Sequence, residues 1–225
     1  MFIVWVLGDR YMTRMIFVRH GQSSGNLEKR FYGHYDGALT KMGIEQAKKT
    51  AEYLKDTHID VAYASDLVRA FETGRIIAEP HGLVPTPDRE LRELYAGEWE
   101  NIPFEELPKR YPESIRVWVT DIGNSRPDGG ESVRELSERI RRAVWRIAEE
   151  NEGKNVLIAT HATPIRMLAC EWFGKTVEEA QGVEWVKNAS VCIVDYDIAA
   201  HTTMVELYDE ASFMGDMITT LPNSL

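Results

Sequence analysis

The sequence predicts an α/β fold: a three-layer sandwich in which helices cover both faces of a mostly parallel central sheet. Short apolar runs typical of buried strands alternate along the chain with segments whose apolar residues recur every three to four positions, as in amphipathic helices. Such alternation is typical of parallel sheets covered on both faces. The length of 225 residues suits one domain of this class.

The first predicted strand and helix lie near the N-terminus. Residues 1–14 are expected to form an N-terminal extension, and the apolar run at residues 15–18 forms the first strand. After a polar loop, Thr40 is placed to cap a helix. The apolar residues of that helix recur along one face, as expected for a helix packed on a sheet; they are Ile44, Ala47, Ala51 and Leu54.

A second strand and helix follow. Residues 61–64 form a short apolar strand, and a helix is expected from about Asp66, with Ser65 or Asp66 as its cap. Residues 83–84 lie between a glycine and a proline, which predicts a further short strand there.

The second half continues the alternation after an irregular segment. Residues 95–130 are rich in aromatic residues and proline, and they end in the turn sequence Pro127-Asp-Gly-Gly130. A helix is expected over residues 131–150 and a buried strand over 156–160. Thr163-Pro164 is expected to begin the next helix, which Gly174 ends. Residues 191–194 and 203–207 are the last predicted strands, and 211–225 form a C-terminal tail.

Composition excludes several classes of protein. The net charge of -10 argues against a general nucleic-acid binder, which needs a basic surface. The apolar run at residues 2–7 is too short to cross a membrane and lacks a basic leader, so a cytoplasmic protein with no membrane partner is expected. Two cysteines, Cys170 and Cys192, are too few for a disulfide framework. The sequence leaves a homodimer open.

Cationic and imidazole side chains follow three of the predicted strands. Arg19 and His20 follow the first strand, residues 65–69 follow the second, and His161 follows the strand at 156–160. Ligands of open α/β sheets bind beyond the carboxyl ends of the strands. We therefore expect these side chains to converge on one site.

The segment Val18-Arg-His-Gly-Gln-Ser23 is the most specific of these. Arg19 offers a planar fork of donors that suits phosphate oxygens, and His20 can act as a nucleophile through a neutral ring nitrogen. Gly21 would let the backbone come close to a ligand. The alternative is a core histidine beside an exposed arginine, and the tripeptide by itself does not separate the two.

Other residues could complete phosphoester chemistry. Glu93 lies in a loop before a glycine turn and could protonate a leaving oxygen, although the chain has 36 acidic residues and this signal is weak by itself. His161 precedes a helix N-terminus, where anions bind favourably. A zinc site shared by His20 and His161 is disfavoured, because no third ligand has the expected spacing and nearby arginines would repel the ion.

Two further residues are weak signals by themselves. Arg69 lies in the first turn of its predicted helix and could reach back over the strand end, although a surface salt bridge is the better interpretation for that residue alone. Asn26 is an ordinary loop residue that could donate its amide to a phosphate.

Together these segments resemble the histidine phosphatase superfamily, which includes the cofactor-dependent phosphoglycerate mutases. The resemblance runs from about Met15 to Leu207, with its markers in family order. The markers are Arg19-His20-Gly21, Asn26, residues 33–43, residues 65–73, residues 91–99, Gly129-Gly-Glu-Ser132 and Thr160-His161. It implies a histidine phosphatase domain over residues 15–210.

The resemblance also implies roles for the matching residues. His20 would be the phosphorylated nucleophile, and Glu93 would protonate the leaving group and then activate water. The phosphoryl oxygens would be held by Arg19, Gly21, Asn26, Arg69, His161 and the backbone of Ala162. Ala162 and Asn101 stand where the family often has glycine, which affects substrate preference more than chemistry. No metal or other cofactor is implied.

The expected function is therefore metal-independent hydrolysis of a small phosphomonoester through a phosphohistidine, as in acid or broad-specificity phosphatases. Residues 95–130 are expected to form a partial lid. A phosphoglycerate mutase is the alternative, but mutases carry a longer insertion in this region. A non-catalytic phosphate sensor is disfavoured, because His20, Glu93 and His161 are all present. The lid aromatics could accommodate an apolar leaving group or form the lid's own core; they are Tyr95, Trp99, Phe104, Tyr111 and Trp118.

Overall fold

A computed structural model describes residues 12–220 and contains one six-stranded sheet with the strand order β3-β2-β4-β1-β5-β6. The strands are β1 (Thr13–Arg19), β2 (Val61–Ser65), β3 (Thr86–Asp88), β4 (Asn155–Thr160), β5 (Val191–Asp197) and β6 (Thr202–Glu210). Strands β1 to β4 pair in parallel, whereas β5 pairs antiparallel with β1 and β6. The predicted mostly parallel α/β sandwich is confirmed.

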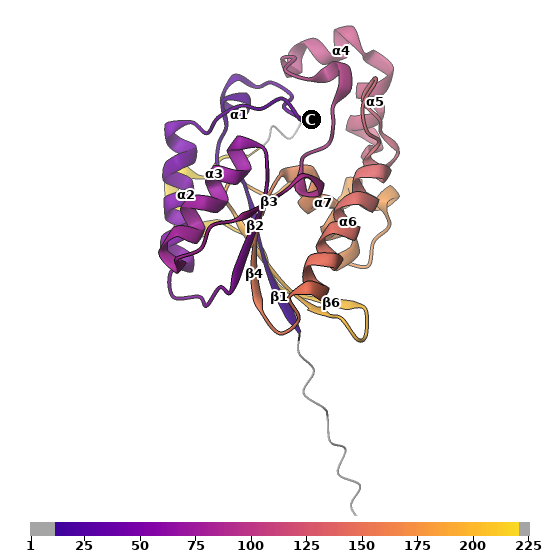
Figure 1. Cartoon of the computed structure of the whole chain (residues 1–225). Coiled ribbons are helices and arrows are strands. Elements are labelled where there is room, and N and C mark those ends of the chain that lie inside the picture. The colour runs from indigo at the N-terminus through magenta and orange to yellow at the C-terminus, as the bar shows by residue number, and fades with distance from the viewer. Residues whose placement is uncertain (1–11, 221–225) are drawn as a thin grey trace, which may run out of the picture.

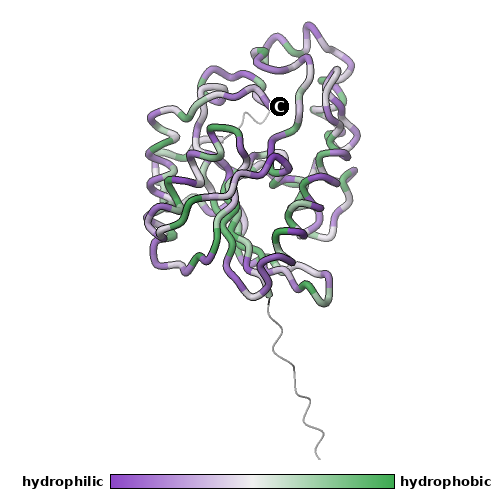
Figure 2. The backbone as a smooth tube through the Cα atoms, in the orientation of Figure 1, coloured by the Kyte–Doolittle hydropathy of each residue, from purple (hydrophilic) through white to green (hydrophobic). Residues whose placement is uncertain are grey.

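Alternate residues of the central strands serve two separate cores. In β1, Met15 and Phe17 join the larger core, which contains α6 (Val133–Glu150) and α7 (Ala162–Trp172). Ile16 and Val18 join the smaller core, which contains α2 (Lys41–Leu54) and α3 (Val68–Ala78). Side chains of a strand alternate between the faces of a sheet, so one apolar run fills both layers. Figure 1 shows the two helix pairs on opposite sides of the sheet, and Figure 2 shows green, hydrophobic residues along the strands between them.

Helix starts follow local capping chemistry where the sequence offers it. The Thr40 hydroxyl accepts the Gly43 N–H at 3.0 Å and begins α2 as predicted. Ser132 and Glu135 form a reciprocal capping box at the start of α6. The buried face of α2 excludes Ile44, which is 37% exposed; Ala47, Ala51 and Leu54 carry it instead.

Two predicted boundaries before residue 90 are wrong. Helix α3 begins at Val68 with no side-chain cap. The carboxylate of Asp66, one of the two predicted caps, instead accepts two 2.6 Å hydrogen bonds from the Arg92 guanidinium. The short strand is Thr86–Asp88 rather than 83–84, and Val84 is exposed. Strand β3 lies at the sheet edge, where Pro87 can be tolerated although it lacks an N–H.

Two predictions in the second half also need correction. Helix α7 begins at Ala162 with His161 as its N-cap residue, so Thr163 and Pro164 lie inside its first turn. Residues 95–130 are not irregular throughout, since they contain α4 (Leu107–Arg110) and α5 (Pro112–Thr120). Prolines begin these helices near their first positions, where a missing N–H costs nothing.

The same end of the sheet carries several short elements. Helices α4 and α5 lie near the carboxyl ends of the parallel strands, at the same end of the molecule as α1 (Ser24–Glu28), where the sequence predicts only a polar loop (Figure 1). Within residues 12–220, no helix is both long enough and apolar enough to cross a bilayer.

The ends of the described chain pack against the sheet and α2. Strand β1 begins at Thr13, so the last residues of the expected extension belong to the sheet, whereas residues 1–11 lie outside the described part. Met214 is buried, and the Phe213 ring stacks on Tyr53 with centroids 4.3 Å apart. Residues 221–225 of the expected tail also lie outside it.

Candidate active site

Two neighbouring strands place the two histidines side by side. Arg19 at the end of β1 pairs with Thr160 at the end of β4. The His20 N–H continues the ladder by donating to the Thr160 carbonyl at 2.9 Å. The rings of His20 and His161 therefore meet edge to face, with centroids 5.2 Å apart. The predicted convergence of strand ends is present in the fold.

The His20 ring is held in one tautomer by its own backbone. Its Nδ1 lies 2.7 Å from the carbonyl oxygen of Gly21. A carbonyl oxygen only accepts hydrogen bonds, so Nδ1 carries the proton and Nε2 carries a lone pair. Burial, with the positive charges of Arg69 and Arg19, holds the pKa of His20 well below its usual range. The ring is therefore neutral near pH 7.

Two buried guanidinium groups, those of Arg19 and Arg69, lie at the same site. Burial lowers the pKa of Arg19 to about 10 and also lowers that of Arg69, so both stay charged near neutral pH. Arg19 Nη1 donates to the Val186 carbonyl at 2.6 Å, and Arg69 donates to the carbonyls of Gly33, Tyr35 and Tyr32. These carbonyls are neutral, and the main opposing charge for both guanidinium groups is Glu93. The site therefore favours an anion when the Glu93 carboxyl group is protonated.

Glu93 contributes a buried carboxyl group to the same cavity. Its Oε1 accepts the Leu94 N–H at 2.7 Å, and its Oε2 accepts the Thr163 N–H at 3.3 Å, in the first turn of α7. Burial raises the pKa of Glu93, while these hydrogen bonds and Arg69 partly oppose the rise. A carboxyl group with a raised pKa can exist in the protonated form that donates a proton.

His161 is fully buried at the start of α7. Its Nε2 lies 2.8 Å from the Ser65 hydroxyl, whereas Nδ1 is buried without a hydrogen-bond partner. Burial and nearby positive charge hold the pKa of His161 well below its usual range. A bound anion would favour the protonated ring, because opposite charges raise the pKa of a histidine.

Asn26 lines the cavity, and its side-chain oxygen is held by hydrogen bonds. The Oδ1 atom accepts from the Ser23 N–H at 3.1 Å and from Asn188 Nδ2 at 3.2 Å. This arrangement turns the amide NH₂ group into a candidate donor for a ligand. Ser23 and Asn26 together cap α1, and their three-residue spacing is the signal that could have singled out Asn26 from the sequence.

Gly21 has a different role from the one expected. Its N–H donates to the Thr73 hydroxyl at 3.1 Å, and it does not line the cavity. A Cβ atom at this position would lie 2.3 Å from the carbonyl oxygen of Gly43. The glycine therefore permits close packing of the loop on α2, rather than close approach of the backbone to a ligand.

Asn101 and Ala162, which stand where the family often has glycine, both suit their places in the backbone. Asn101 has a φ of 60°, in the left-handed region where glycine is preferred and asparagine is tolerated. Ala162 lines the cavity as the first residue of α7, so its backbone N–H belongs to the helix N-terminus.

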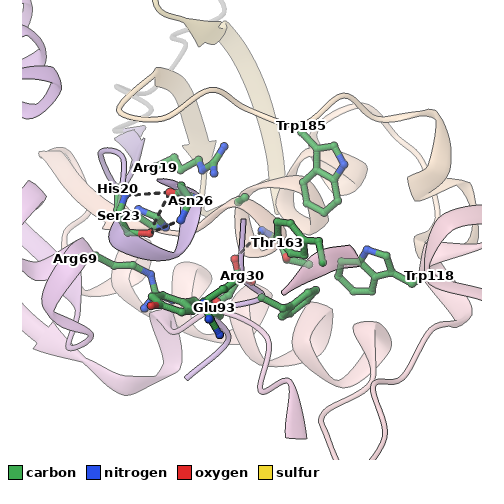
Figure 3. A pocket seen from close by; sticks show the side chains of 14 residues that line it. Arg19, His20, Ser23, Asn26, Arg30, Arg69, Glu93, Trp118, Thr163 and Trp185 are labelled. Carbon is green, nitrogen blue, oxygen red and sulfur yellow. Dashed lines mark hydrogen bonds between the residues drawn. The ribbon is translucent and has the colours of Figure 1, made fainter. Parts of the chain in front are cut away.

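Figure 3 shows the cavity, with Trp118 and Trp185 on the side away from His20 and Ser23. His161 contacts the ring of His20 but, like Gly21, does not itself line the cavity. Trp185 and its neighbour Asn188 were missed by the sequence analysis, because they lie in an irregular segment without a motif. The lining consists of Arg19, His20, Ser23, Asn26, Arg30, Phe31, Tyr32, Arg69, Glu93, Phe104, Trp118, Ala162, Thr163 and Trp185.

The lid aromatics divide between the two uses left open. Trp99 is fully buried in the larger core, Trp118 belongs to that core and also lines the cavity, and Phe104 packs against the core and lines the cavity. Within the described residues, no group of three or more histidine, cysteine, aspartate or glutamate side chains has the arrangement of a metal site.

Comparison with known proteins shows which family the chain belongs to. Residues 15–209 match the model of the family described as "Histidine phosphatase superfamily (branch 1)". The chain belongs to the histidine phosphatase superfamily.

Relatives within the superfamily have different names. The chain is 37% identical over 184 residues to phosphoglycerate mutase-like protein 4 of Arabidopsis thaliana, covering 80% of this chain and 77% of that one. It is 31% identical over 163 residues to phosphoserine phosphatase 1 of Hydrogenobacter thermophilus, covering 72% and 77%. The solved structure of YhfR from Bacillus stearothermophilus aligns with a TM-score of 0.85 at 26% identity, covering 90% of this chain and 99% of that one.

Proposed function

We propose that this protein is a metal-independent phosphatase that hydrolyses small phosphomonoesters through a phosphohistidine at His20. The observation that supports the proposal most strongly is the neutral His20 ring, whose Nδ1 is committed to the Gly21 carbonyl at 2.7 Å. Its Nε2 lone pair is left for a phosphorus atom. Arg19 and Arg69 supply buried positive charge at the same cavity.

The first step transfers the phosphoryl group to His20. Arg19, Arg69, Asn26, His161 and the Ala162 N–H bind the phosphoryl oxygens. The Nε2 lone pair forms the new P–N bond while the P–O bond to the leaving group breaks. Glu93 gives its proton to the leaving oxygen, which departs as an alcohol. Fixed positive charge stabilises the negative charge on the phosphoryl oxygens throughout the transfer.

The second step returns the protein to its starting form. A water molecule attacks the phosphorus atom of the phosphohistidine, and the Glu93 carboxylate accepts one of its protons. The P–N bond breaks, its electron pair returns to Nε2, and inorganic phosphate leaves. Glu93 is then protonated and ready for another ester. Neither step needs a metal, because the guanidinium groups supply the positive charge.

Residues 95–130 form a partial lid in this proposal, since Phe104 and Trp118 come from this segment and line the cavity. A mutase must keep its phosphohistidine from water, which requires a closed and dry site. The lid is built from short helices of four and nine residues. We expect such a lid to admit water, which makes water the principal acceptor.

We also propose that the protein acts in the cytoplasm.

The experiment compares acceptors directly, with EDTA present. The protein is incubated with 3-phosphoglycerate and a catalytic amount of 2,3-bisphosphoglycerate, and separately with a panel of phosphomonoesters. We expect inorganic phosphate from the panel and little 2-phosphoglycerate. The His20→Ala variant should release none, whereas His58→Ala, which removes an exposed histidine, should match the wild type. Rapid interconversion of the phosphoglycerates with only trace hydrolysis would identify a mutase.

A further inference from the structure

The cavity has two chemically different ends. His20, Arg19, Arg69 and Glu93 gather at one end. Trp118 and Trp185 lie at the other end (Figure 3), where Phe31 packs on Trp118 and Phe104 packs on Phe31, so this end is built from aromatic rings of three separate parts of the chain. Arg30 also lines the cavity, and in Figure 3 it lies near Glu93, between His20 and the two tryptophans. Its Nη1 donates to the Asn101 carbonyl at 2.7 Å, and its Nε lies 3.1 Å from a Glu28 carboxylate oxygen.

The rings of the aromatic end are held by contacts with one another and with Arg166. The guanidinium of Arg166 lies 4.1 Å from the ring centroid of Trp185, and it is anchored by the Ala180 carbonyl. The Trp118 ring stacks on Trp185 with centroids 6.3 Å apart and meets Phe31 edge to face at 5.4 Å. Rings that are already ordered lose little conformational entropy on binding.

Two of these rings keep surface available to a ligand. Phe104 and Trp185 are half-buried, whereas Phe31 and Trp118 are buried. Hydroxyl groups of a sugar or glycerate would face mainly aromatic carbon there and would recover few of their hydrogen bonds to water, the unpaired indole N–H of Trp118 being the donor available at that end. A flat apolar group would instead exchange water for ring contacts.

We propose that the preferred substrates are phosphomonoesters whose leaving group carries an aromatic ring close to the ester oxygen, with Trp185 and Phe104 as specificity-determining residues. This inference rests on the proposed phosphatase function and names its substrate class. The phosphoryl group occupies the arginine end, and the ring of the leaving group packs on Trp185 and Phe104.

The test uses two esters with similar leaving alcohols, 2-phenylethyl phosphate and ethyl phosphate. Both alcohols need the same help from a general acid, so their kcat/KM ratio measures recognition of the ring. We expect the wild type to favour 2-phenylethyl phosphate by about tenfold or more. The ratio should fall to about threefold or less in Trp185→Leu and in Phe104→Leu. The control Phe173→Leu changes an exposed ring that packs on Tyr208, and it should keep the wild-type ratio.

The outcomes separate this inference from the function on which it rests. A wild-type ratio near one, or a ratio that both variants leave unchanged, would overturn the aromatic preference while phosphatase activity stands. Absence of phosphate release from every ester, p-nitrophenyl phosphate included, would overturn the proposed function and the substrate class with it.

A separate observation concerns Arg139 on α6. All five of its N–H donors are used. Nε and Nη2 donate to the Glu131 carboxylate at 2.9 and 2.8 Å. Nη1 donates to the carbonyls of Glu90 and Arg92 at 2.6 and 3.1 Å, and Nη2 also donates to the Glu93 carbonyl at 3.2 Å. The backbone N–H of Glu131 in turn donates to the Tyr95 carbonyl at 2.8 Å.

We infer that Arg139 is a positioning residue for Glu93. The Arg139 guanidinium donates to three backbone carbonyls of the loop that carries Glu93 and so connects this loop to α6. The Glu93 carbonyl also accepts a hydrogen bond from His34 Nε2 at 2.9 Å. These bonds fix the backbone from which the carboxyl group projects. Loss of Arg139 would let that group move away from the leaving oxygen, and misplacement by about 1 Å can cost about 10²-fold in rate.

The test measures how the rate loss depends on the leaving group. Arg139→Gln should lower kcat about 10- to 100-fold for ethyl phosphate and clearly less for p-nitrophenyl phosphate, whose leaving group departs without a proton. Glu131→Gln should show the same pattern more weakly. The matched control is Arg142→Gln, an exposed arginine on the same helix that contacts the Glu90 carboxylate. Equal losses for both esters, or no loss in either variant, would overturn the positioning role. If Glu93→Gln itself shows no leaving-group dependence, the acid role of Glu93 fails instead.

Discussion

The Nδ1 atom of His20 lies 2.7 Å from the carbonyl oxygen of Gly21, the next residue in the chain. The orientation of the proposed nucleophile therefore depends on the backbone path at Gly21. That path passes so close to α2 that a Cβ atom at Gly21 would lie 2.3 Å from the Gly43 carbonyl oxygen. Packing between this loop and α2 thus controls which ring nitrogen faces the cavity.

Substitution of Gly21 by alanine should impair both stability and turnover. Overpacking against rigid backbone typically costs about 1–3 kcal/mol, and the carbonyl that orients His20 must shift to make room. Urea unfolding and the kcat for p-nitrophenyl phosphate measure the two effects. Gly182→Ala is the control, since its Cβ would meet only the Lys175 Nζ atom at 3.6 Å. Wild-type stability and turnover in Gly21→Ala would contradict this account of the loop.

The pH dependence of activity follows from two pKa shifts of opposite sign, those of His20 and Glu93. Burial and neighbouring arginines lower the pKa of His20, while burial raises the pKa of Glu93. The active form needs neutral His20 and protonated Glu93, so activity falls when acid protonates His20 and when base deprotonates Glu93. We expect a bell-shaped kcat/KM profile with its maximum on the acid side of neutral for alkyl phosphates. A profile that still rises through neutral pH to alkaline pH would argue against Glu93 as the acid.

Glu93→Gln should distinguish esters by their leaving groups. The amide keeps the shape of the side chain but has no proton to give, and a general acid typically contributes about 10²–10⁴-fold. Hydrolysis of ethyl phosphate should therefore fall strongly, and that of p-nitrophenyl phosphate should fall less. Steady-state kinetics of both esters measure this. The alkaline limb of the ethyl phosphate pH profile should also flatten. Matching losses for the two esters would remove Glu93 from the proton transfer.

The framework of the candidate site could be predicted because it lies at strand ends. His20 and His161 each follow an apolar run that reads as a buried strand, and parallel neighbours bring their carboxyl ends together. Arg69 could be placed by the same rule, although its helix begins two residues later than expected. The competing partner of Asp66, the Arg92 guanidinium, is distant in sequence and gives no local signal.

The other parts of the candidate site could not be predicted, because they depend on contacts between segments that are distant in sequence. Asn188 donates to the His20 carbonyl at 3.0 Å across 168 positions of sequence, and no periodicity surrounds it. Trp185 enters the cavity from the same irregular segment. Gly21 has a sequence signal, but its packing partner Gly43 could not be inferred, because close approach of two backbones leaves no pattern in either segment.

The central claim is that His20 carries the phosphoryl group, and rapid-quench labelling tests it most directly. The protein is mixed with p-nitrophenyl phosphate labelled at phosphorus, quenched in alkali within the first turnover, digested and mapped. We predict an acid-labile label on His20, its absence in His20→Ala, and its persistence in His58→Ala. A label on another residue, or near-native turnover by His20→Ala, would contradict the account.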